Sequence, residues 1–536
     1  MPDTTDKTVI DKRNIQRLIS KNIFISIGSK VFGLMVRFFM PPLILTFIDL
    51  EKYGIWAICF TIIGYLNLGA FGVANVYIRY VAEYHARQQT EKINGLLSTG
   101  VIIISSINMI MLGVLWFVLD SLVTDIFKIP PELHEMAFIL FYGTAFVFLI
   151  QQAFGAFQHM LNGLQKIAET TLIMGFCLVL ETSLTVLLLF QGWGLYAMLT
   201  SLIIRYIVSI SLCMILAFKT VPDLSIHPKH FNLAYLKVFY RFGAIVQLSS
   251  MLGMLTNSMG RIIASTTLSM QATALLALGT RFPSMARSIP ATTTAVYLPV
   301  MAYLYGQQRF EEMRDIYLQG SRVNTFISGF IMGYLAAFSS PLIAAWLGTQ
   351  AQYQTAAFIL SIFTFPQHLH TLTGQGSVFF KGIDKPVNNL VYSVSRLSFT
   401  LISLGILFYF FETTIVNITI AISIATIISA LIYIINNHRI IKLSFPNYII
   451  KVLIPGFVPY VIAYLIAWLL TPWDAPVMLN RWYAAGFVII SGMLYSFVTL
   501  GVIYGILLYP QERNYLYQMV MRKLTGLLKN RRGGKK

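Results

Sequence analysis

The chain has 536 residues, of which 57% are hydrophobic and 11% are charged, and its mean hydropathy is +0.71. Soluble domains carry about 25% charged residues, so this composition excludes an ordinary soluble protein. The net charge of +18 could suggest a nucleic-acid partner, but the cations gather in the connections between apolar runs, so we expect none.

Apolar runs of about 20 residues, each long enough to cross a bilayer, follow one another along the chain. We predict an all-α polytopic membrane protein with about fourteen transmembrane helices. The predicted spans are 23–48, 54–80, 96–119, 136–161, 170–191, 194–218, 239–267, 272–303, 323–346, 355–380, 387–411, 413–435, 452–471 and 482–508. The first run follows a basic, polar stretch and is itself a full span, so no cleaved signal peptide is expected.

Loop charges predict the orientation. With the N-terminus in the cytoplasm, the outside loops together hold only Lys52, Lys128 and Arg481, and the other loop and tail cations fall inside. An excess of lysine and arginine on the cytoplasmic side is the usual asymmetry of membrane proteins. We therefore expect both termini to be cytoplasmic and the number of spans to be even. The outside loops are too short to form a soluble domain.

Two parts of the chain resemble each other at a separation of 219–220 residues. VAEYHARQQTEKINGLLSTG (81–100) resembles MAYLYGQQRFEEMRDIYLQG (301–320), and LNGLQK (161–166) resembles FKGIDK (380–385). Ala82/Ala302, Gln88/Gln308, Glu91/Glu311, Gly100/Gly320, Gly163/Gly382 and Lys166/Lys385 are identical pairs. Both matches follow corresponding spans, which indicates two six-helix halves of the same orientation, as in transporters built from parallel repeats.

The predicted organisation has six parts. They are a cytoplasmic N-terminal segment (1–22), an N-lobe (23–218), a cytoplasmic linker (219–238), a C-lobe (239–435), two further helices (452–508) and a basic cytoplasmic tail (509–536). The tail mixes apolar and basic residues at helical spacing up to about residue 530, so we expect that part to lie on the membrane surface.

Cations inside the predicted spans are the main functional signal. They are Lys30, Arg37, Arg205, Arg261, Arg281, Arg287 and Arg396. A charge in the bilayer is costly, so such residues usually face a water-filled cavity or a substrate path. An internal salt bridge or a snorkelling side chain could explain any one of them, and Arg396 has no clear polar support on its own helix. The set predicts an anion-binding cavity, since the arginine fork suits pyrophosphate.

Only one acid, Glu181, lies comparably deep. It could bind a coupling ion, a proton or sodium. Alternatively, it could be the structural partner of an embedded arginine, with Arg205 on the next helix as the nearest candidate.

Neutral polar residues in the spans could line the same cavity and bond sugar hydroxyls. Asn67 and Asn75 lie eight residues apart on one face, and Asn257 lies one turn before Arg261. Gln367 and His370 stand in a polar stretch with His368 and Gln375. Helix packing through buried amides is the alternative for this stretch.

Metal, cofactor and enzyme signals are weak. The two histidines share no helix face and have no acid nearby, and Cys59, Cys177 and Cys213 have no ligand or disulfide spacing. We expect no metal and no cofactor. We find no nucleophile elbow, P-loop or zinc motif, and so expect a transporter rather than an enzyme.

The stretch 51–87 carries YGIW, then GYLNLGAFG, then RYVAEY, and NGLQK and KGIDK end two later loops. The matching residues are Tyr53, Gly54, Trp56, Gly64, Leu68, Gly69, Gly72, Arg79 and Tyr80. This pattern resembles polysaccharide flippases of the multidrug/oligosaccharidyl-lipid/polysaccharide exporter superfamily. The resemblance implies a flippase of the O-antigen exporter type, which moves an undecaprenyl-pyrophosphate-linked oligosaccharide across the bacterial inner membrane for lipopolysaccharide biosynthesis.

Many O-antigen exporters are read as twelve-helix proteins, whereas about fourteen spans, as predicted here, is the number in the related lipid II flippases. The resemblance to those flippases implies that the last two spans form a groove for the lipid tail. We expect a monomer. The alternatives are a cation-coupled multidrug exporter of the same superfamily, a membrane glycan polymerase or transferase, and an assembly scaffold.

Overall fold

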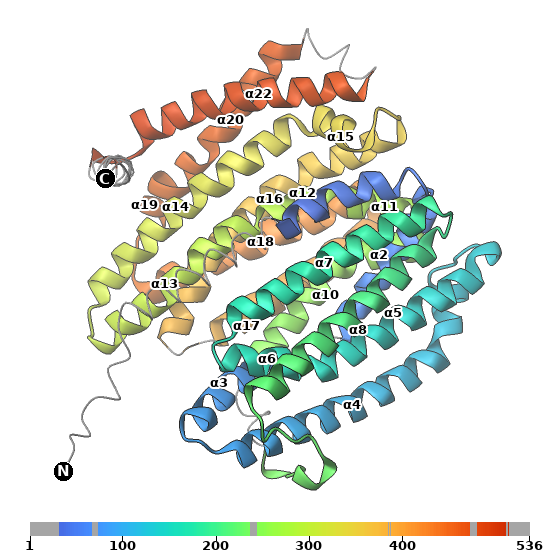
Figure 1. Cartoon of the computed structure of the whole chain (residues 1–536). Coiled ribbons are helices and arrows are strands. Elements are labelled where there is room, and N and C mark those ends of the chain that lie inside the picture. Colours follow the sequence, from blue (N-terminus) through green and yellow to red (C-terminus); the bar gives the residue numbers. More distant parts are fainter. Residues whose placement is uncertain are drawn as a thin grey trace, which may run out of the picture. The chain divides into compact units, whose positions relative to one another are not determined.

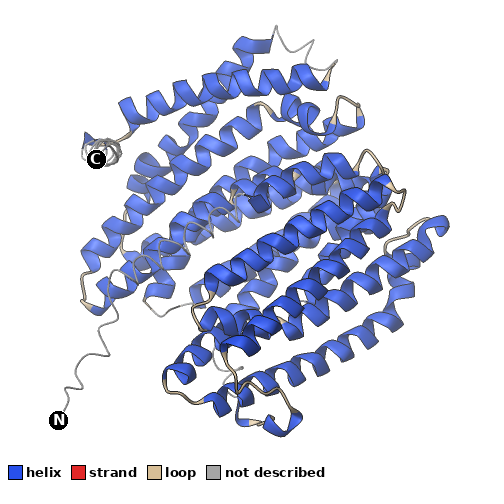
Figure 2. Ribbon diagram, in the orientation of Figure 1, coloured by secondary structure: helices blue, strands red, loops and turns tan. Residues whose placement is uncertain are grey.

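A computed structural model gives the structure of the chain, and it describes residues 32–66, 73–235, 244–383, 385, 387–471, 480–510 and 513. In these residues the chain is almost entirely helical and contains no β-strand (Figure 2). Eight helical segments of the described chain are long and apolar enough to cross a membrane. The prediction of an all-α polytopic membrane protein is therefore confirmed. The count of about fourteen spans stays a prediction.

The eight segments coincide with eight of the predicted spans. They are Thr90–Ile126, Pro131–Gly163, Ile167–Phe190, Leu195–Thr220, Val387–Phe410, Ile415–Ile441, Phe445–Leu470 and Arg481–Leu507. The predicted span 323–346 is instead a bent pair, in which α14 (Phe310–Ala337) and α15 (Ser339–Leu347) meet at 75°. Pro341 lies in the first turn of α15, where its missing N–H is tolerated, but in an unbroken helix it would remove a bond and clash.

The chain divides into two compact units, and each is described by itself. Unit 1 consists of Met1–Leu278 and Pro386–Ala425, and unit 2 consists of Gly279–Lys385 and Thr426–Lys536. The predicted lobes are defined by a sequence repeat rather than by contacts, and their boundaries stay a prediction.

The helices of unit 1 are labelled in Figure 1, apart from the first described helix, Phe32–Ile44. They are α2 (Leu50–Leu66), α3 (Val73–Ala86), α4 (Thr90–Ser121), α5 (His134–Phe154), α6 (Ala156–Gly163), α7 (Ile167–Phe190), α8 (Leu195–Thr220), α10 (Ala244–Thr267), most of α11 (Met270–Gly279) and α17 (Val387–Phe410), with short turns η2 (Leu122–Ile126), η3 (Pro131–Leu133) and η4 (Pro228–His230).

Unit 2 contains the remaining helices. They are α12 (Arg281–Ala286), α13 (Ser288–Gly306), α14, α15, α16 (Gln352–Gly382), α19 (Phe445–Tyr448), α20 (Ile454–Leu470) and α22 (Arg481–Val502), with π-helical turns η5 (Ile449–Leu453) and η7 (Ile503–Leu507). Helix α18 (Ile415–Ile441) is divided between the units after Ala425.

In unit 1, α4, α5, α8 and α7 run side by side in that order (Figure 1). The segment after α8 is tied to the beginning of α4 by side chains of that helix. The Asn94 amide donates to the carbonyl of Asp223 and accepts from the N–H of Ser225, both at 3.0 Å. The hydroxyl of Thr99 accepts from the N–H of Asn232 at 2.9 Å. These bonds satisfy the backbone of a connection that would otherwise lack partners.

In unit 2, α14 packs against both α16 and α20. Its approach to α20 is close because glycine stands on both helices. A methyl group on Gly456 would collide with the hydroxyl of Thr325, and one on Gly329 would collide with the carbonyl of Gly456. Small residues let membrane helices approach closely enough for dense packing.

Arg322 ties the last helices to α14. Its side chain is buried, and it donates to the carbonyls of Lys451 at 2.9 Å and Leu507 at 3.0 Å. Its guanidinium also lies 4.0 Å from the centre of the Tyr509 ring. The charge is thus compensated by two carbonyl dipoles and an aromatic face.

The two repeated sequence motifs form matching turns. Gln88 and Gln308 both adopt a left-handed backbone, with φ of 55° and 60°. The following N–H bonds the carbonyl five residues back in each case, from Gln89 at 2.9 Å and from Arg309 at 3.0 Å. Lys166 and Lys385 make the equivalent bond in the second motif, at 2.9 and 2.8 Å. Matching local structure at both motifs supports an internal repeat.

We predict that Gly456→Leu lowers the yield of folded protein severely, because the new side chain would push α20 away from α14. Gly501→Leu is the control, since nothing lies within 4 Å of the position its Cβ would occupy. Size-exclusion profiles of both variants in detergent measure the effect. A monodisperse Gly456→Leu peak equal to that of Gly501→Leu would contradict the predicted role of the close approach.

Candidate charged sites in the membrane-spanning helices

The one deep acid is engaged by an arginine on the neighbouring helix. Glu181 lies on α7 and Arg205 on α8, and the Arg205 Nη1 donates to the Glu181 Oε2 at 2.6 Å. The side chains are only 27% and 22% exposed, for Arg205 and Glu181 respectively. This contact is the structural partnership that the sequence offered as one alternative. The ion-coupling alternative stays a prediction.

A second arginine is bound to a neutral amide. Arg396 lies on α17, is 3% exposed, and donates from Nη2 to the Oδ1 of Asn257 on α10 at 2.9 Å. The two helices are also joined by the hydroxyls of Ser249 and Ser393, 2.9 Å apart. Ser249 and Asn257 of α10 therefore both have polar partners on α17.

Two arginines lie at the ends of α12 in unit 2. Pro283 falls inside this short helix and Pro290 lies in the first turn of α13. Arg281 is the first residue of α12 and Arg287 follows its last residue, and both are half-buried. The Nη1 of Arg287 lies 3.4 Å from the Oε1 of Gln367, which is a long hydrogen bond.

The polar stretch of α16 joins a neutral network in unit 2. His368 is buried, its Nε2 lies 3.1 Å from the hydroxyl of Thr325, and its ring stacks on Phe457 with centroids 5.2 Å apart. Gln375 is also fully buried, whereas His370 is half-buried. These contacts of His368 are those expected for helix packing through buried polar groups.

Asn324 forms the best-satisfied part of this network. Its Oδ1 accepts from the hydroxyl of Thr293 at 2.8 Å, and its Nδ2 donates to the hydroxyl of Thr294 at 2.7 Å. The amide is fully buried, so both bonds are needed to offset its desolvation.

The remaining predicted site residues are not brought together by these contacts. Lys30 and Asn67 lie outside the described residues, and Asn75 lies in α3 with its side chain outside the description. Arg37 is exposed on the helix Phe32–Ile44, and Arg261 is half-buried on α10. A common anion-binding role for these residues stays a prediction.

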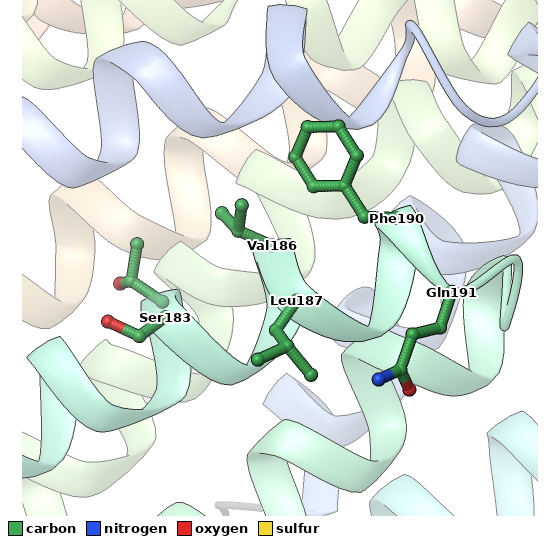
Figure 3. A pocket seen from close by; sticks show the side chains of 6 residues that line it. Ser183, Val186, Leu187, Phe190 and Gln191 are labelled. Atoms are coloured by element: carbon green, nitrogen blue, oxygen red, sulfur yellow. The ribbon is translucent and has the colours of Figure 1, made fainter.

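An open groove runs along the second half of α7 (Figure 3). Its volume is about 630 Å³, and its lining consists of Thr182, Ser183, Val186, Leu187, Phe190 and Gln191. Val186 and Phe190 project from one side of the helix, and Leu187 and Gln191 from the other (Figure 3). None of the predicted arginines lines this groove, so it is not the predicted anion site.

Sequence reasoning missed two buried polar anchors. Arg322 was expected in a connection that ends at residue 322, but α14 begins at Phe310 and carries it into the helix. The sequence did favour a continuous helix here, because no proline and only one glycine lie between Phe310 and Arg322. The role of Asn324 could not be predicted, since the sequence does not identify a partner for a lone asparagine in an apolar run.

No group of three or more His, Cys, Asp and Glu side chains that could hold a metal occurs in the described part of the chain.

Solved structures share this fold. A lipid II flippase, MurJ, in an inward closed conformation, superposes with a TM-score of 0.65 at 14% identity, over 90% of this chain and 98% of that one. An inward-facing multidrug resistance transporter of the MATE family superposes with a TM-score of 0.63 at 16% identity, over 79% of this chain and 98% of that one. A transporter from Pyrococcus furiosus, described as having a binding pocket of reverse polarity, gives 0.52 at 15% identity, over 79% and 95%.

The chain therefore has the fold of transporters of the multidrug/oligosaccharidyl-lipid/polysaccharide exporter (MOP) superfamily. Residues 19–304 match the model of the polysaccharide biosynthesis protein family, and the chain belongs to that family. No curated protein matches the chain closely enough to add a nearer relative.

We predict that Glu181→Leu destabilises the protein by about 1–3 kcal/mol, because it leaves a half-buried guanidinium without its acid. The double variant with Glu181→Arg and Arg205→Glu should recover most of the loss. Thermal unfolding of the purified protein in detergent measures both.

The control is Lys166→Ala, which removes a 3.7 Å pair with Glu169 that is more than 40% exposed on both sides. Such surface pairs contribute about 0–1 kcal/mol, so this variant should unfold near the wild-type temperature. An unchanged melting temperature for Glu181→Leu would show that the pair does not hold α7 to α8.

Proposed function

We propose that this protein is a flippase that moves a polyprenyl-pyrophosphate-linked oligosaccharide across the bacterial cytoplasmic membrane by alternating access. Undecaprenyl is the expected lipid, and an O-antigen unit for lipopolysaccharide is the first glycan to test. Membership of the polysaccharide biosynthesis protein family supports the substrate class. The fold shared with transporters supports transport rather than enzyme chemistry.

The observation that carries the proposal is the charge balance inside the spans. Glu181 is the only acid deep in the predicted spans, and Arg205 engages it. The other embedded cations therefore give the spans a net positive charge. A positive interior is costly in hydrocarbon unless an anion or water compensates it, and a pyrophosphate is such an anion.

In the proposed mechanism, the embedded cations contact the pyrophosphate while the polyprenyl tail stays in lipid. These cations are Lys30, Arg37, Arg205, Arg261, Arg281 and Arg287. The guanidinium forks bind phosphate oxygens in pairs. Asn67, Asn75, Asn257, Gln367 and His370 would bond the glycan or its phosphates. Glu181 is the proposed residue for a coupling proton or sodium ion, and ion binding there requires its bond to Arg205 to open.

A cation-coupled multidrug exporter is the second candidate, because the fold is also that of MATE transporters. The charge balance favours the flippase, since a cationic drug would be repelled by the arginines that attract a pyrophosphate.

Proteoliposomes test the two candidates directly. The purified chain is reconstituted with a labelled undecaprenyl-pyrophosphate oligosaccharide, and an added lectin reports headgroups that reach the outer leaflet. We expect protein-dependent exposure of the headgroup and no gradient-driven uptake of ethidium. Ethidium transport without headgroup exposure would overturn the flippase in favour of the exporter.

We predict that Arg261→Ala and Arg281→Ala each weaken headgroup binding by roughly ten- to a hundredfold. Charge-assisted bonds to phosphate contribute about 1.5–3 kcal/mol, and about 1.4 kcal/mol corresponds to tenfold in affinity. Lysine at either position should restore binding only in part, because it lacks the fork.

Arg309→Ala is the control, since Arg309 is exposed at the beginning of α14 and pairs with Glu312. Arg261→Ala and Arg281→Ala variants that insert normally and expose the headgroup at the wild-type rate would contradict the anion-binding role.

We also predict a cytoplasmic C-terminus, which follows from the positions of the loop cations. Alkaline phosphatase fused after residue 536 should be inactive, and a green fluorescent protein fused at the same place should be bright. Phosphatase activity at this position would mean an odd number of spans or the opposite orientation.

A further inference from the structure

Arg396 is an unusual residue because it is a charged group buried almost completely within a membrane-spanning helix. It lies in the tenth position of α17, about 14 Å from the beginning of the helix at 1.5 Å per residue. Its guanidinium carries five N–H donors. The guanidinium donates from Nη2 to the Oδ1 of Asn257, and its Nε has no partner in the described part of the chain.

Asn257 has the opposite environment. Its side chain is exposed, although it lies midway along α10 and its oxygen reaches a residue that is 3% exposed. The amide therefore spans from the buried contact between α10 and α17 to the exposed side of α10. An exposed amide that faced hydrocarbon would leave its donors unsatisfied at a cost of several kcal/mol, so this side of the helix faces water or a polar ligand.

The bond to Arg396 decides which end of the amide is presented. A guanidinium has only donors, so the group that faces it must be the carbonyl oxygen of Asn257. The NH₂ group of Asn257 then points away from Arg396 and offers two donors on the exposed side. Without Arg396, no other hydrogen bond among the described residues would prevent the amide from turning over and presenting its oxygen instead.

Arg261 lies four residues beyond Asn257, one turn along the same face of α10. This face of α10 thus carries an exposed amide and, one turn further, a half-buried guanidinium. In this orientation of the amide, both groups offer hydrogen-bond donors and no acceptor. The combination suits phosphate oxygens and disfavours a cation.

We propose that Arg396 is a positioning residue, which fixes Asn257 as a hydrogen-bond donor and so completes an anion-recognising face on α10 with Arg261. The inference rests on the proposed function, because it names the pyrophosphate of the lipid-linked headgroup as the anion. Arg396 itself does not touch the headgroup. It determines that Asn257 presents its NH₂ donors, rather than its oxygen, to the headgroup.

Asn257→Asp is the decisive variant. A carboxylate accepts from Arg396 at least as well as the amide does, so the contact between α10 and α17 should survive and thermal stability should not fall. The exposed side, however, would now present an acceptor with negative charge. We expect the affinity for inorganic pyrophosphate, titrated calorimetrically into the purified full-length protein in detergent, to fall tenfold or more.

Two variants of the positioning residue complete the test. Arg396→Gln removes the obligate donor and lets the Asn257 amide turn over, so pyrophosphate affinity should fall severalfold. Arg396→Lys keeps a donor-only group and should restore part of that affinity. Ser393→Ala is the matched control, because it removes the neighbouring 2.9 Å bond to Ser249 on the same pair of helices without affecting the amide. Its affinity should equal that of the wild type.

The outcomes separate the two proposals. If Arg261→Ala weakens pyrophosphate binding but Asn257→Asp binds as tightly as the wild type, the positioning role is overturned and the proposed function stands. If Ser393→Ala weakens binding as much as Arg396→Gln, the effect belongs to helix packing and the positioning role is again overturned. If the wild type itself does not bind pyrophosphate, both proposals fall.

Discussion

The cost of placing charge in hydrocarbon governs this structure. Each cation that enters a span must be compensated by an acid, by dipoles, by an aromatic face or by a ligand. The described contacts provide three of these solutions. Arg205 has the one deep acid, Arg322 has two carbonyls and a ring, and Arg396 has a single amide oxygen. The charge of Arg396 is the least compensated of the three, so packing alone explains its presence least well.

Neutral polar groups follow the same rule with smaller stakes. In unit 2, Asn324 is satisfied by two threonine hydroxyls, and His368 lies between a hydroxyl and an aromatic ring. In unit 1, Asn94 satisfies the backbone of the connection after α8. Lipid tails are as apolar as leucine, so apolar contacts alone do not fix the helices relative to one another. Polar side chains in this protein therefore contribute much of the specific bonding between helices.

The fold class could be predicted from the sequence because hydrocarbon imposes a length and a polarity on every span. Matching turns at Gln88 and Gln308 could be expected from their shared sequence, since a left-handed residue after a helix is a local property. The Glu181–Arg205 contact was foreseen as an alternative, because no other acid was available. The Arg396–Asn257 pair was not foreseen, since the residues are 139 positions apart and only packing of α10 on α17 joins them. The break between α14 and α15 was also missed, because the apolar pattern continues through it.

The anchoring of Arg322 bears on whether the chain is modular. Helices α20 and α22 follow the repeated part of the sequence and resemble a C-terminal extension added to an older two-lobed protein. Yet the carbonyls that receive Arg322 come from the turn that begins α20 and the turn that ends α22. Without these turns, the buried guanidinium of Arg322 would lose both of its carbonyl acceptors. A shorter ancestor or a truncated homologue would therefore need a different residue at this position, so the identity of residue 322 should vary together with the presence of the last two helices.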